Sequence, residues 1–370
     1  MIPVSRTHIP KKSVQLVTEC LNSGWISGQG KYVEKFEKKF SQFVGTKYAL
    51  ATNSGTSALH LAILTLGIGP GDEVILPAST IASCFFAIWY TGAKAIPVDV
   101  TPDTYTINPQ LIESHITKNT KAIMAVHLYG HPCDMDALVH LCHKHKLFLI
   151  EDAAEAHGAE YKGKKVGSFG DVSCFSFYAN KLITTGEGGA VVTNSNSHHV
   201  LAKKLRTLYF SDQKRFIHDG IGYKYVMTNL QAALGLASLA EIKKSISFKK
   251  KMAELYQNHL YEIPGLILPI EKVNCSNVYW MYAICIEEKK FGMNRDQLMD
   301  ILWNKYHIET RTFFYPPNIA FASLGVFSKQ YFPIADKISQ EGLYLPSGLG
   351  NTTEEFKAVC NAIQKISKTH

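Results

Sequence analysis

Short apolar stretches alternate with longer amphipathic ones through the first two thirds of the sequence. Each short stretch is apolar almost throughout, and the residues between two stretches repeat apolar positions at helical spacing. Strands that are apolar on both faces and are separated by helices are typical of a parallel sheet covered on both sides. The pattern therefore predicts an α/β domain over residues 21–235. The stretches expected to form its strands are residues 48–54, 72–78, 94–100, 120–130, 146–158, 171–177 and 190–194.

The pattern changes in the last third of the chain. A long helical run over residues 230–260 is followed by a strand, a helix, a second strand and a last helix. Elements in that order predict a smaller α+β domain over residues 236–370. Residues 1–20 are expected to pack beside this second domain.

The composition is that of an ordinary soluble protein. The chain has 370 residues, of which 46% are hydrophobic and 19% are charged, and a chain of this length usually forms two domains. Its N-terminus lacks the apolar region of a secretory signal, and its longest apolar runs, such as residues 84–90, are too short to cross a membrane. The eight cysteines are scattered without a CxxC pair, which is typical of reduced thiols. We therefore expect a cytoplasmic protein that does not contact membranes.

The net charge of +8 does not by itself indicate a partner. Lysines at 243–244 and 249–251 fall in a helical segment, where we expect them on a solvated face. There is no arginine-rich tract, zinc-finger spacing or aromatic RNA-binding motif, so we expect no nucleic acid partner. A small acidic substrate, such as a phosphorylated metabolite, fits the charge. Histidines and cysteines gather at 127–133 and 142–145, but they fall at a strand end and on a polar helix, and we expect no metal site.

Three of the predicted strands end in residues suited to chemistry, and parallel strands place such ends at one edge of the sheet. At the first, Asn53, Ser54, Gly55 and Thr56 turn directly into a helix, whose free N–H groups and dipole attract a phosphate. The alternative is an ordinary capped helix. At the second, Asp152 follows a strand that should be buried. Its carboxylate is suited either to hold a protonated ring nitrogen or to cap a helix.

The third strand end leads to Lys181, which stands between an apolar run and a glycine-rich turn. A buried lysine is costly without a partner, so this residue either lies at the surface or is retained for chemistry. An amine in a partly desolvated cleft loses some of its charge and becomes a nucleophile toward carbonyl groups. Ser176, shortly before it, faces away from Phe175 and Phe177 if the strand alternates regularly.

Together, the phosphate cradle, the aspartate and the lysine meet the requirements of pyridoxal phosphate. The helix N-terminus binds the phosphate, Asp152 keeps the pyridine nitrogen protonated, and Lys181 forms a Schiff base with the aldehyde. The combination favours a chemical role for Lys181 and predicts a pyridoxal phosphate enzyme.

The sequence resembles the DegT/DnrJ/EryC1/StrS family of sugar aminotransferases, which are pyridoxal phosphate enzymes of fold type I. The resemblance extends over nearly the whole chain. It implies an α/β, aspartate aminotransferase-like fold, in which a large domain with a mainly parallel sheet is joined to a smaller C-terminal α+β domain. Some members are dehydratases with a histidine in place of the lysine, so Lys181 implies amino transfer. The matching segments are WISGQGKYVEKFE (25–37), ATNSGTSALHLA (51–62), GDEVILPAST (71–80), HLYGHPCDMD (127–136), EDAAEAHGAEYKGKKVGSFGD (151–171), CFSFYANKLITTGEGG (174–189) and MTNLQAALG (227–235).

The resemblance implies a role for each matching position. Lys181 corresponds to the Schiff-base lysine and Asp152 to the partner of the pyridine nitrogen. Glu155 corresponds to a Gln or Glu that approaches the phenolic oxygen of the cofactor. The positions that correspond to phosphate contacts are Gly55, Thr56 and Ser176.

Three positions, in two segments, depart from the family pattern. The segment GYKYVMTN (222–229) stands where the family often has GYNYRMTN, so Lys224 and Val226 replace an Asn and an Arg. This segment commonly reaches the cofactor site of the partner subunit. Lys224 therefore either contacts the phosphate across a dimer or is a surface lysine. Ile81 stands where an aromatic residue often stacks on the pyridine ring, which leaves open the residue that covers that face.

Within the family, the sequence is most similar to 4-aminotransferases of the perosamine type, which serve lipopolysaccharide O-antigen synthesis. This implies that a nucleotide-linked 4-keto-6-deoxyhexose, above all GDP-4-keto-6-deoxymannose, is converted to the 4-amino-4,6-dideoxy sugar. It also implies L-glutamate as amino donor and a homodimer with its active site at the subunit interface. The alternatives are a UDP- or dTDP-sugar 3- or 4-aminotransferase, and a non-catalytic regulator that binds the cofactor. Candidate substrate residues, in segments that resemble the lining of the sugar pocket, are Trp25 (or a core or structural residue), Ser27, Arg311 and Tyr315.

Overall fold

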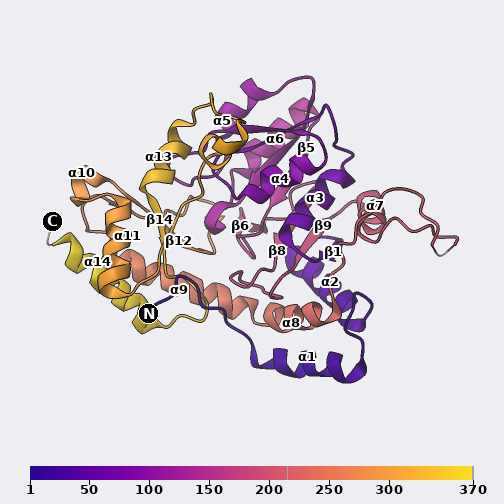
Figure 1. Ribbon diagram of the computed structural model, residues 1–370, viewed down its shortest axis with the longest axis horizontal. Coiled ribbons are helices and arrows are strands. Elements are labelled where there is room, and N and C mark those ends of the chain that lie inside the picture. The colour runs from indigo at the N-terminus through magenta and orange to yellow at the C-terminus, as the bar shows by residue number, and fades with distance from the viewer. Residues whose placement is uncertain (215, 369–370) are drawn as a thin grey trace.

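The centre of the protein is a seven-stranded sheet, and the computed structural model describes residues 1–214 and 216–368 (Figure 1). Every neighbouring pair of strands is parallel except the two pairs that include β9. The mainly parallel α/β sheet expected from the apolar stretches is therefore confirmed. In order across the sheet, the strands are β1 (Tyr48–Thr52), β9 (Gly189–Thr193), β8 (Val172–Ser176), β5 (Phe148–Asp152), β4 (Thr120–Val126), β2 (Glu73–Pro77) and β3 (Lys94–Val98).

The direction of β9 follows from the chain that precedes it. Residues 177–188, between β8 and β9, contain no helix that would carry the chain across a face of the sheet. The chain therefore turns back and pairs antiparallel with its own preceding strand. As a result, this connection, with Lys181 in it, lies at the carboxyl end of β8, where Ser176 and Thr52 of β1 both pair with Gly189.

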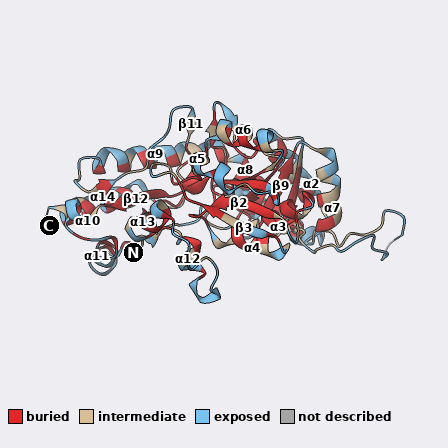
Figure 2. Ribbon diagram, turned by 90° about the horizontal axis from the view of Figure 1, so that it is seen from above, coloured by how far each residue is buried: buried red, intermediate tan, exposed pale blue. Residues whose placement is uncertain are grey.

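Helices cover both faces of the sheet, and the alternation of side chains along each strand decides which residues meet them. In β1, Leu50 packs into the cluster on one face, while Ala49 and Ala51 pack into the cluster on the other. Figure 2 shows buried residues along the sheet and on the inward sides of the helices. The helices on the Leu50 face are α3 (Gly55–Thr65), α4 (Ala82–Tyr90) and α7 (Asn196–Arg206), and those on the opposite face are α2 (Lys31–Val44), α6 (Met135–His145) and α8 (Asn229–Ala240).

The C-terminal part contains a second, antiparallel sheet with helices packed on it, as the strand and helix order predicted. The helical run expected over residues 230–260 is two helices, because Glu241 leaves helical geometry with φ −100° and ψ 4°. The strands, in order across the sheet, are β10 (Leu266–Ile267), β12 (Tyr282–Ile286), β14 (Gly342–Leu345) and β13 (Arg311–Thr312). The long helices beside it are α9 (Ile242–Leu260), α11 (Arg295–Tyr306) and α14 (Thr353–Ser367).

The N-terminal segment contacts both parts of the molecule. Ile2 forms a β-bridge with Ile308, and the Val4 carbonyl accepts the Ser347 N–H, so these first residues lie beside the C-terminal sheet. α1 (Lys11–Ser23) instead packs along α8 (Figure 1). The division of the chain into two domains at residue 235 stays a prediction.

Shorter elements complete the described chain. A three-stranded sheet is formed by β7 (Lys164–Lys165), β6 (Glu160–Tyr161) and β11 (Cys275–Ser276). The short helices are α5 (Pro109–Ile112), η1 (Glu113–His115), η2 (Leu128–Gly130), α10 (Glu288–Phe291), α12 (Pro317–Ala320), η3 (Ala322–Leu324) and α13 (Pro333–Glu341). In the part of the chain that the structure describes, no helix combines the length and apolar character needed to cross a membrane.

The expectation that the α9 lysines lie on a solvated face is wrong for Lys249. Its side chain is 2% exposed, whereas Lys250 and Lys251 are exposed. Lys249 stands at helical spacing before Met252 and Tyr256, which are buried on the same face of α9. The helical spacing of these residues therefore indicates the buried face of α9, whereas the charge of Lys249 led to the expectation that it is exposed.

Candidate active site

Lys181 lies in the connection between β8 and β9 and is 9% exposed. Its Nζ is 3.5 Å from Oε1 of Glu155 and 3.6 Å from the centre of the Trp280 ring. Burial lowers the pKa of Lys181, while the Glu155 carboxylate acts in the opposite direction. A lowered pKa increases the fraction of neutral amine, which is the nucleophilic form. Lys181 is therefore buried beside a carboxyl group and an aromatic ring. Such surroundings suit a nucleophilic amine, and they are not those of a surface lysine.

Glu155 is held by an unusual turn at the end of β4. Its Oε2 accepts the backbone N–H of Tyr129 at 2.8 Å. Tyr129 has φ 53° and ψ 13°, a left-handed conformation that is uncommon for an aromatic residue. Burial raises the pKa of Glu155. The turn thus fixes a buried carboxyl group within reach of Lys181.

Asp152 is the last residue of β5 and is 3% exposed. Its Oδ1 accepts the N–H of Ala154 at 3.0 Å, but residues 153–159 form turns and no helix, so the helix-capping alternative is wrong. Its Oδ2 accepts the thiol of Cys84, on α4, at 3.2 Å. Asp152 lines the same cavity as Lys181.

The start of α3 forms the wall opposite these groups. Ser54 caps the helix by accepting the N–H of Ser57 at 3.0 Å, and the first N–H groups of a helix have no acceptor within it. A Cβ on Gly55 would lie 2.8 Å from Cβ of Ser176, so only glycine allows the helix to approach β8 this closely. Thr56 donates its hydroxyl to Ser83 on α4 at 2.9 Å. The geometry is that of an anion site at a helix N-terminus.

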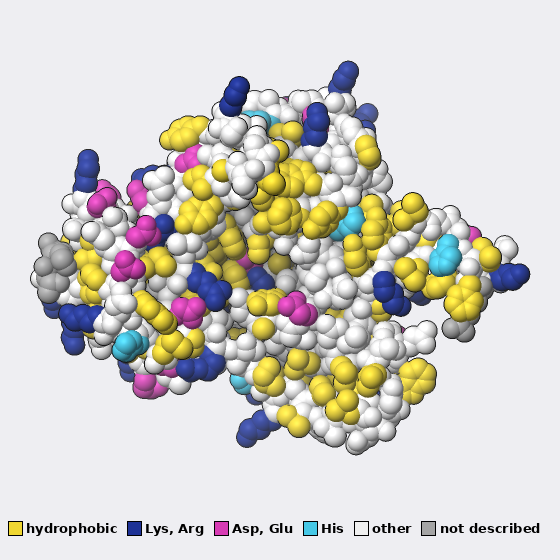
Figure 3. All heavy atoms as spheres, viewed as in Figure 1, with side chains coloured by type: hydrophobic (Ala, Val, Ile, Leu, Met, Phe, Trp, Pro, Cys, Tyr) yellow, Lys and Arg dark blue, Asp and Glu magenta, His cyan; other side chains and the backbone are white. Residues whose placement is uncertain are grey.

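These groups surround one cavity of about 360 Å³ between the strand ends and the C-terminal sheet. Its size is that of a site for a cofactor-sized molecule. Figure 3 shows a hollow in this region, bordered by hydrophobic, basic and acidic side chains. The sequence-predicted residues that it brings together are Gly55, Thr56, Asp152, Glu155, Ser176, Lys181 and Arg311, and it also contains Ile81.

Four sequence-predicted residues do not line this cavity. Tyr315 lines an adjoining cavity of about 570 Å³, which Arg311 also borders. Trp25 is 58% exposed after α1, so a core role is wrong for it, and Ser27 is exposed beside it. Lys224 is exposed on the segment between α7 and α8, and its backbone pairs with Thr207.

Comparison with known proteins identifies the family of this chain. Residues 7–364 match the DegT/DnrJ/EryC1/StrS aminotransferase family. The chain belongs to this family. The GDP-perosamine synthase of Escherichia coli O157:H7 is 42% identical over 367 residues, which are 99% of this chain and 98% of that protein.

Solved structures of sugar aminotransferases share the fold. DesV from S. venezuelae has a TM-score of 0.90 and 34% identity, covering 96% of this chain and 94% of its own. The PLP form of the putative sugar aminotransferase Spr1654 from Streptococcus pneumoniae has a TM-score of 0.92 and 26% identity, covering 100% of this chain and 99% of its own. The family inferred from the motifs is confirmed, and this member is an aminotransferase with pyridoxal phosphate as cofactor.

The residues of the cavity fit pyridoxal phosphate by their chemistry. A buried amine, a buried carboxylate and a helix N-terminus line one cavity, and each suits a different part of the cofactor. When bound, pyridoxal phosphate supplies an electrophilic carbon and a ring that withdraws electrons from a carbanion. The donor set therefore agrees with the cofactor of the family.

Three contributors to the site were missed by sequence reasoning. Trp280 precedes β12 and contacts Lys181 with its ring, Cys84 donates to Asp152, and Tyr129 donates to Glu155. Trp280 stood in an apolar strand-like run, and Cys84 stood in an apolar helix. Nothing local distinguishes such residues from core residues, because their contacts are made by distant segments of chain.

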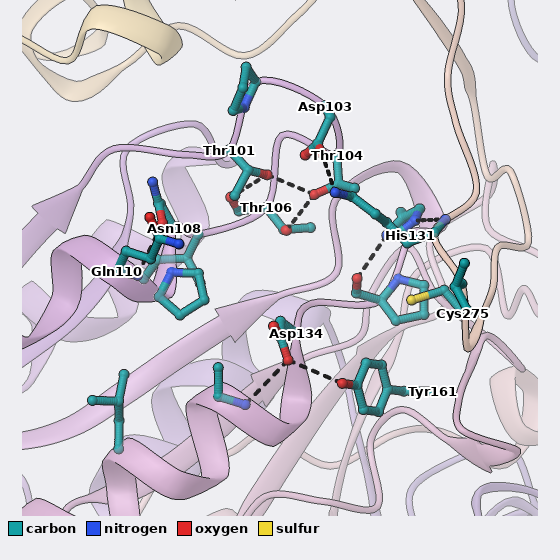
Figure 4. A pocket seen from close by; sticks show the side chains of 18 of the residues that line it. Thr101, Asp103, Thr104, Thr106, Asn108, Gln110, His131, Asp134, Tyr161 and Cys275 are labelled. Carbon is teal, nitrogen blue, oxygen red and sulfur yellow. Dashed lines mark hydrogen bonds and ion pairs between the residues drawn. The ribbon is translucent and has the colours of Figure 1, made fainter.

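A larger cavity of about 670 Å³ lies away from Lys181 (Figure 4). Its threonines bond to one another, with 2.8 Å between the hydroxyls of Thr101 and Thr104 and 2.8 Å between those of Thr104 and Thr106. Tyr161 donates to Asp134, and His131 bonds to a backbone carbonyl. These polar groups are thus bonded within the protein, and Lys181 does not line this cavity.

The histidine and cysteine clusters do not form a metal centre. Nε2 of His127 lies 3.1 Å from Oε2 of Glu151, while Nδ1 accepts the backbone N–H of Cys133. Both ring nitrogens are therefore engaged within the protein. Over residues 1–214 and 216–368, no three His, Cys, Asp or Glu side chains are grouped to hold a metal ion.

Proposed function

We propose that this aminotransferase moves an amino group from L-glutamate to C4 of GDP-4-keto-6-deoxymannose, producing the 4-amino-4,6-dideoxy sugar. The observation that carries the chemistry is the buried Lys181 amine, 3.5 Å from Glu155 and in one cavity with Asp152. The substrate is supported by the full-length similarity to GDP-perosamine synthase at 42% identity. L-glutamate is the donor that the family resemblance implied.

Each residue of the cavity has a distinct role in this proposal. Lys181 would hold the cofactor at its aldehyde carbon through its amine, and the free amine would move a proton at the reacting carbon of the substrate. Asp152 keeps the ring nitrogen protonated, and Glu155 orients the phenolic oxygen and the lysine. The phosphate is held by the N-terminus of α3 through Gly55 and Thr56, with Ser176 as a further ligand.

The sugar nucleotide is proposed to enter through the adjoining cavity. Arg311 borders both cavities, and its Nη2 lies 3.3 Å from Oε1 of Glu309 at the surface. A guanidinium suits the diphosphate or the glutamate carboxylate because it binds planar oxyanions through two hydrogen bonds. Tyr315 and Phe314 line the same cavity and offer apolar surface to the sugar or base.

The working form is proposed to be a homodimer in the cytoplasm. Val14, Leu21 and Trp25 are 68%, 58% and 58% exposed, and hydrophobic side chains gather over α1 in Figure 3. Ile221, on the segment that extends from the body after α7 (Figure 1), is 86% exposed. Apolar surface of this kind favours association with a second copy. The cytoplasm is supported by eight free cysteines.

In such a dimer, Lys224 of one protomer would contact the phosphate in the site of its partner. Mixing Lys181→Ala protein with Lys224→Ala protein tests this, because subunit exchange would create dimers in which one site has both lysines. Activity well above either parent supports the shared site. Activity equal to the mean of the parents, with exchange shown by native mass spectrometry, contradicts it.

The function itself is tested by the absorbance spectrum of the purified protein with pyridoxal phosphate. We expect L-glutamate to convert the cofactor to its amino form in the wild type, and Lys181→Ala to bind cofactor without covalent attachment. Borohydride reduction and peptide mass spectrometry should locate the attachment at Lys181. Attachment at another lysine would overturn the assignment.

The substrate is then tested with GDP-, UDP- and dTDP-linked 3-keto and 4-keto sugars. We expect the highest kcat/KM with GDP-4-keto-6-deoxymannose, with the amine at C4 by NMR. A higher value with another carrier would replace the proposed substrate. Absence of turnover with every keto sugar, despite cofactor attachment, would favour the regulatory alternative.

A further inference from the structure

Lys249 is buried in the middle of α9, and within residues 1–214 and 216–368 no carboxylate accepts a hydrogen bond from it. Its Nζ donates to two neutral backbone carbonyls, that of Trp280 at 2.7 Å and that of Ser347. Burial lowers the pKa of Lys249 to about 7. An amine in such surroundings is costly compared with an apolar residue of similar volume. The hydrogen bonds of the Lys249 amine therefore indicate which part of the structure this residue holds in place.

The two carbonyls flank neighbouring strands of the C-terminal sheet. Trp280 comes just before β12, and Ser347 comes just after β14, which pairs antiparallel with β12. Oγ of Ser347 also accepts the N–H of Tyr282 at 2.9 Å. Lys249 thus links the segment just before β12 to the segment just after β14, and it fixes the backbone of Trp280.

The side chain of Trp280 in turn holds the segment that carries the reactive lysine. Its Nε1 donates to the carbonyl of Asn180 at 3.0 Å, and its ring lies 3.6 Å from Nζ of Lys181. On the same ring, Tyr129 stacks at 6.4 Å with an interplanar angle of 11°. An indole face attracts an ammonium group and also excludes water from it.

We propose that Lys249 is a positioning residue for Lys181, acting through Trp280. The amine of Lys249 anchors the Trp280 carbonyl, and the anchored indole keeps Asn180 and the amine of Lys181 turned toward Glu155. The inference rests on the proposed role of Lys181 as the lysine that binds the cofactor. It adds a residue that does not line the cavity and that acts from the opposite side of the C-terminal sheet.

The test follows covalent attachment of pyridoxal phosphate to Lys181 in full-length protein. Lys249→Met removes the donor and keeps an unbranched apolar side chain, and Lys251→Met is the matched control because Lys251 is exposed on the same helix. The attached fraction is trapped with borohydride at timed intervals and measured by peptide mass spectrometry. We expect attachment to slow by about tenfold in Lys249→Met, as loss of a charged hydrogen bond suggests, and to be unchanged in Lys251→Met. Lys249→Arg, which keeps charged donors, should restore part of the rate.

A double-mutant cycle separates positioning from a purely structural role. If Lys249 acts through the indole, Trp280→Phe slows attachment as well, and adding Lys249→Met to it causes little further loss. Folded Lys249→Met protein with wild-type kinetics overturns the proposal, and so does a double variant whose loss is the product of the single losses. Trp280→Phe with wild-type kinetics overturns it even if Lys249→Met does not fold. Failure of the wild type to attach cofactor at Lys181 would instead refute the proposed function.

Discussion

The pairing of Lys181 with Glu155 gives a quantitative prediction about the reactive amine. Glu155→Gln retains the shape of the side chain and an oxygen to accept the Tyr129 N–H, but it removes a negative charge 3.5 Å from Nζ of Lys181. Burial lowers the pKa of Lys181, and the Glu155 charge opposes that effect. Removing the charge should therefore lower the pKa of Lys181 further.

The size of the effect follows from Coulomb's law. Two unit charges 3.5 Å apart, the distance in this ion pair, interact by about 4.7 kcal/mol at an effective dielectric constant of about 20. Since one pKa unit corresponds to about 1.4 kcal/mol, the upper limit is a fall of about 3.5 units. Solvent and the surrounding polar groups screen such a pair, so we expect the pKa of Lys181 to fall by less than this limit.

The assay is the pH dependence of Lys181 modification by a small amine-directed reagent in cofactor-free protein, followed by peptide mass spectrometry. The midpoint should move to lower pH in Glu155→Gln. It should stay in place in Glu187→Gln, because Glu187 is an exposed carboxylate that lines the same cavity. An unmoved midpoint in Glu155→Gln would mean that the carboxyl group is already neutral in the folded protein, and the reasoning from an ion pair would be refuted.

Two further substitutions test the framework of the site. Glu151 is fully buried and accepts hydrogen bonds from the side chains of His127 and Ser173 and from three backbone N–H groups. Burial favours its neutral form, but these donors outweigh burial and lower its pKa, so its stabilising effect is present at neutral pH and is lost as the pH falls through that lowered value. We expect Glu151→Gln to reduce the free energy of unfolding by about 3 kcal/mol in urea titrations at pH 7, and an unchanged midpoint of denaturation would contradict this. Gly55→Ala should weaken cofactor binding by about tenfold in absorbance titrations, because its Cβ would lie 2.8 Å from that of Ser176 and displace the helix N-terminus. Gly69→Ala, whose Cβ would have its nearest neighbour at 3.7 Å, should bind normally, and equal affinity in both variants would exclude a cradle at Gly55.

The local pattern of the sequence was sufficient for the elements and for part of the site. Apolar runs such as residues 72–78 and 120–130 predicted β2 and β4, because burial on both faces of a sheet requires an apolar residue at every position. Asp152 and Lys181 could be placed at strand ends, and strands that run in parallel bring such ends to one edge. The cofactor followed from residue types, since few cofactors need a phosphate cradle, a carboxylate and an amine together, and the family resemblance implied amino transfer.

Features that depend on contacts between distant segments appeared only in the tertiary structure. The direction of β9 depended on the chain between it and β8, and the break at Glu241 divided a helical pattern that looked continuous. Trp280 could not be recognised, because its contact with Lys181 exists only when the C-terminal sheet packs over the strand ends.

Lys249 shows most clearly where sequence reasoning ends. Its spacing to Met252 and Tyr256 is that of the buried face of α9, but its charge led to the expectation of a solvated face. The conflict is resolved by two backbone carbonyls at strand ends far along the chain. The sequence by itself therefore determined most of the elements and the family, and it predicted the reacting groups, because these depend on periodicity and residue type. The tertiary structure decided which groups touch, because hydrogen bonds and burial depend on the packing of segments that no local pattern connects.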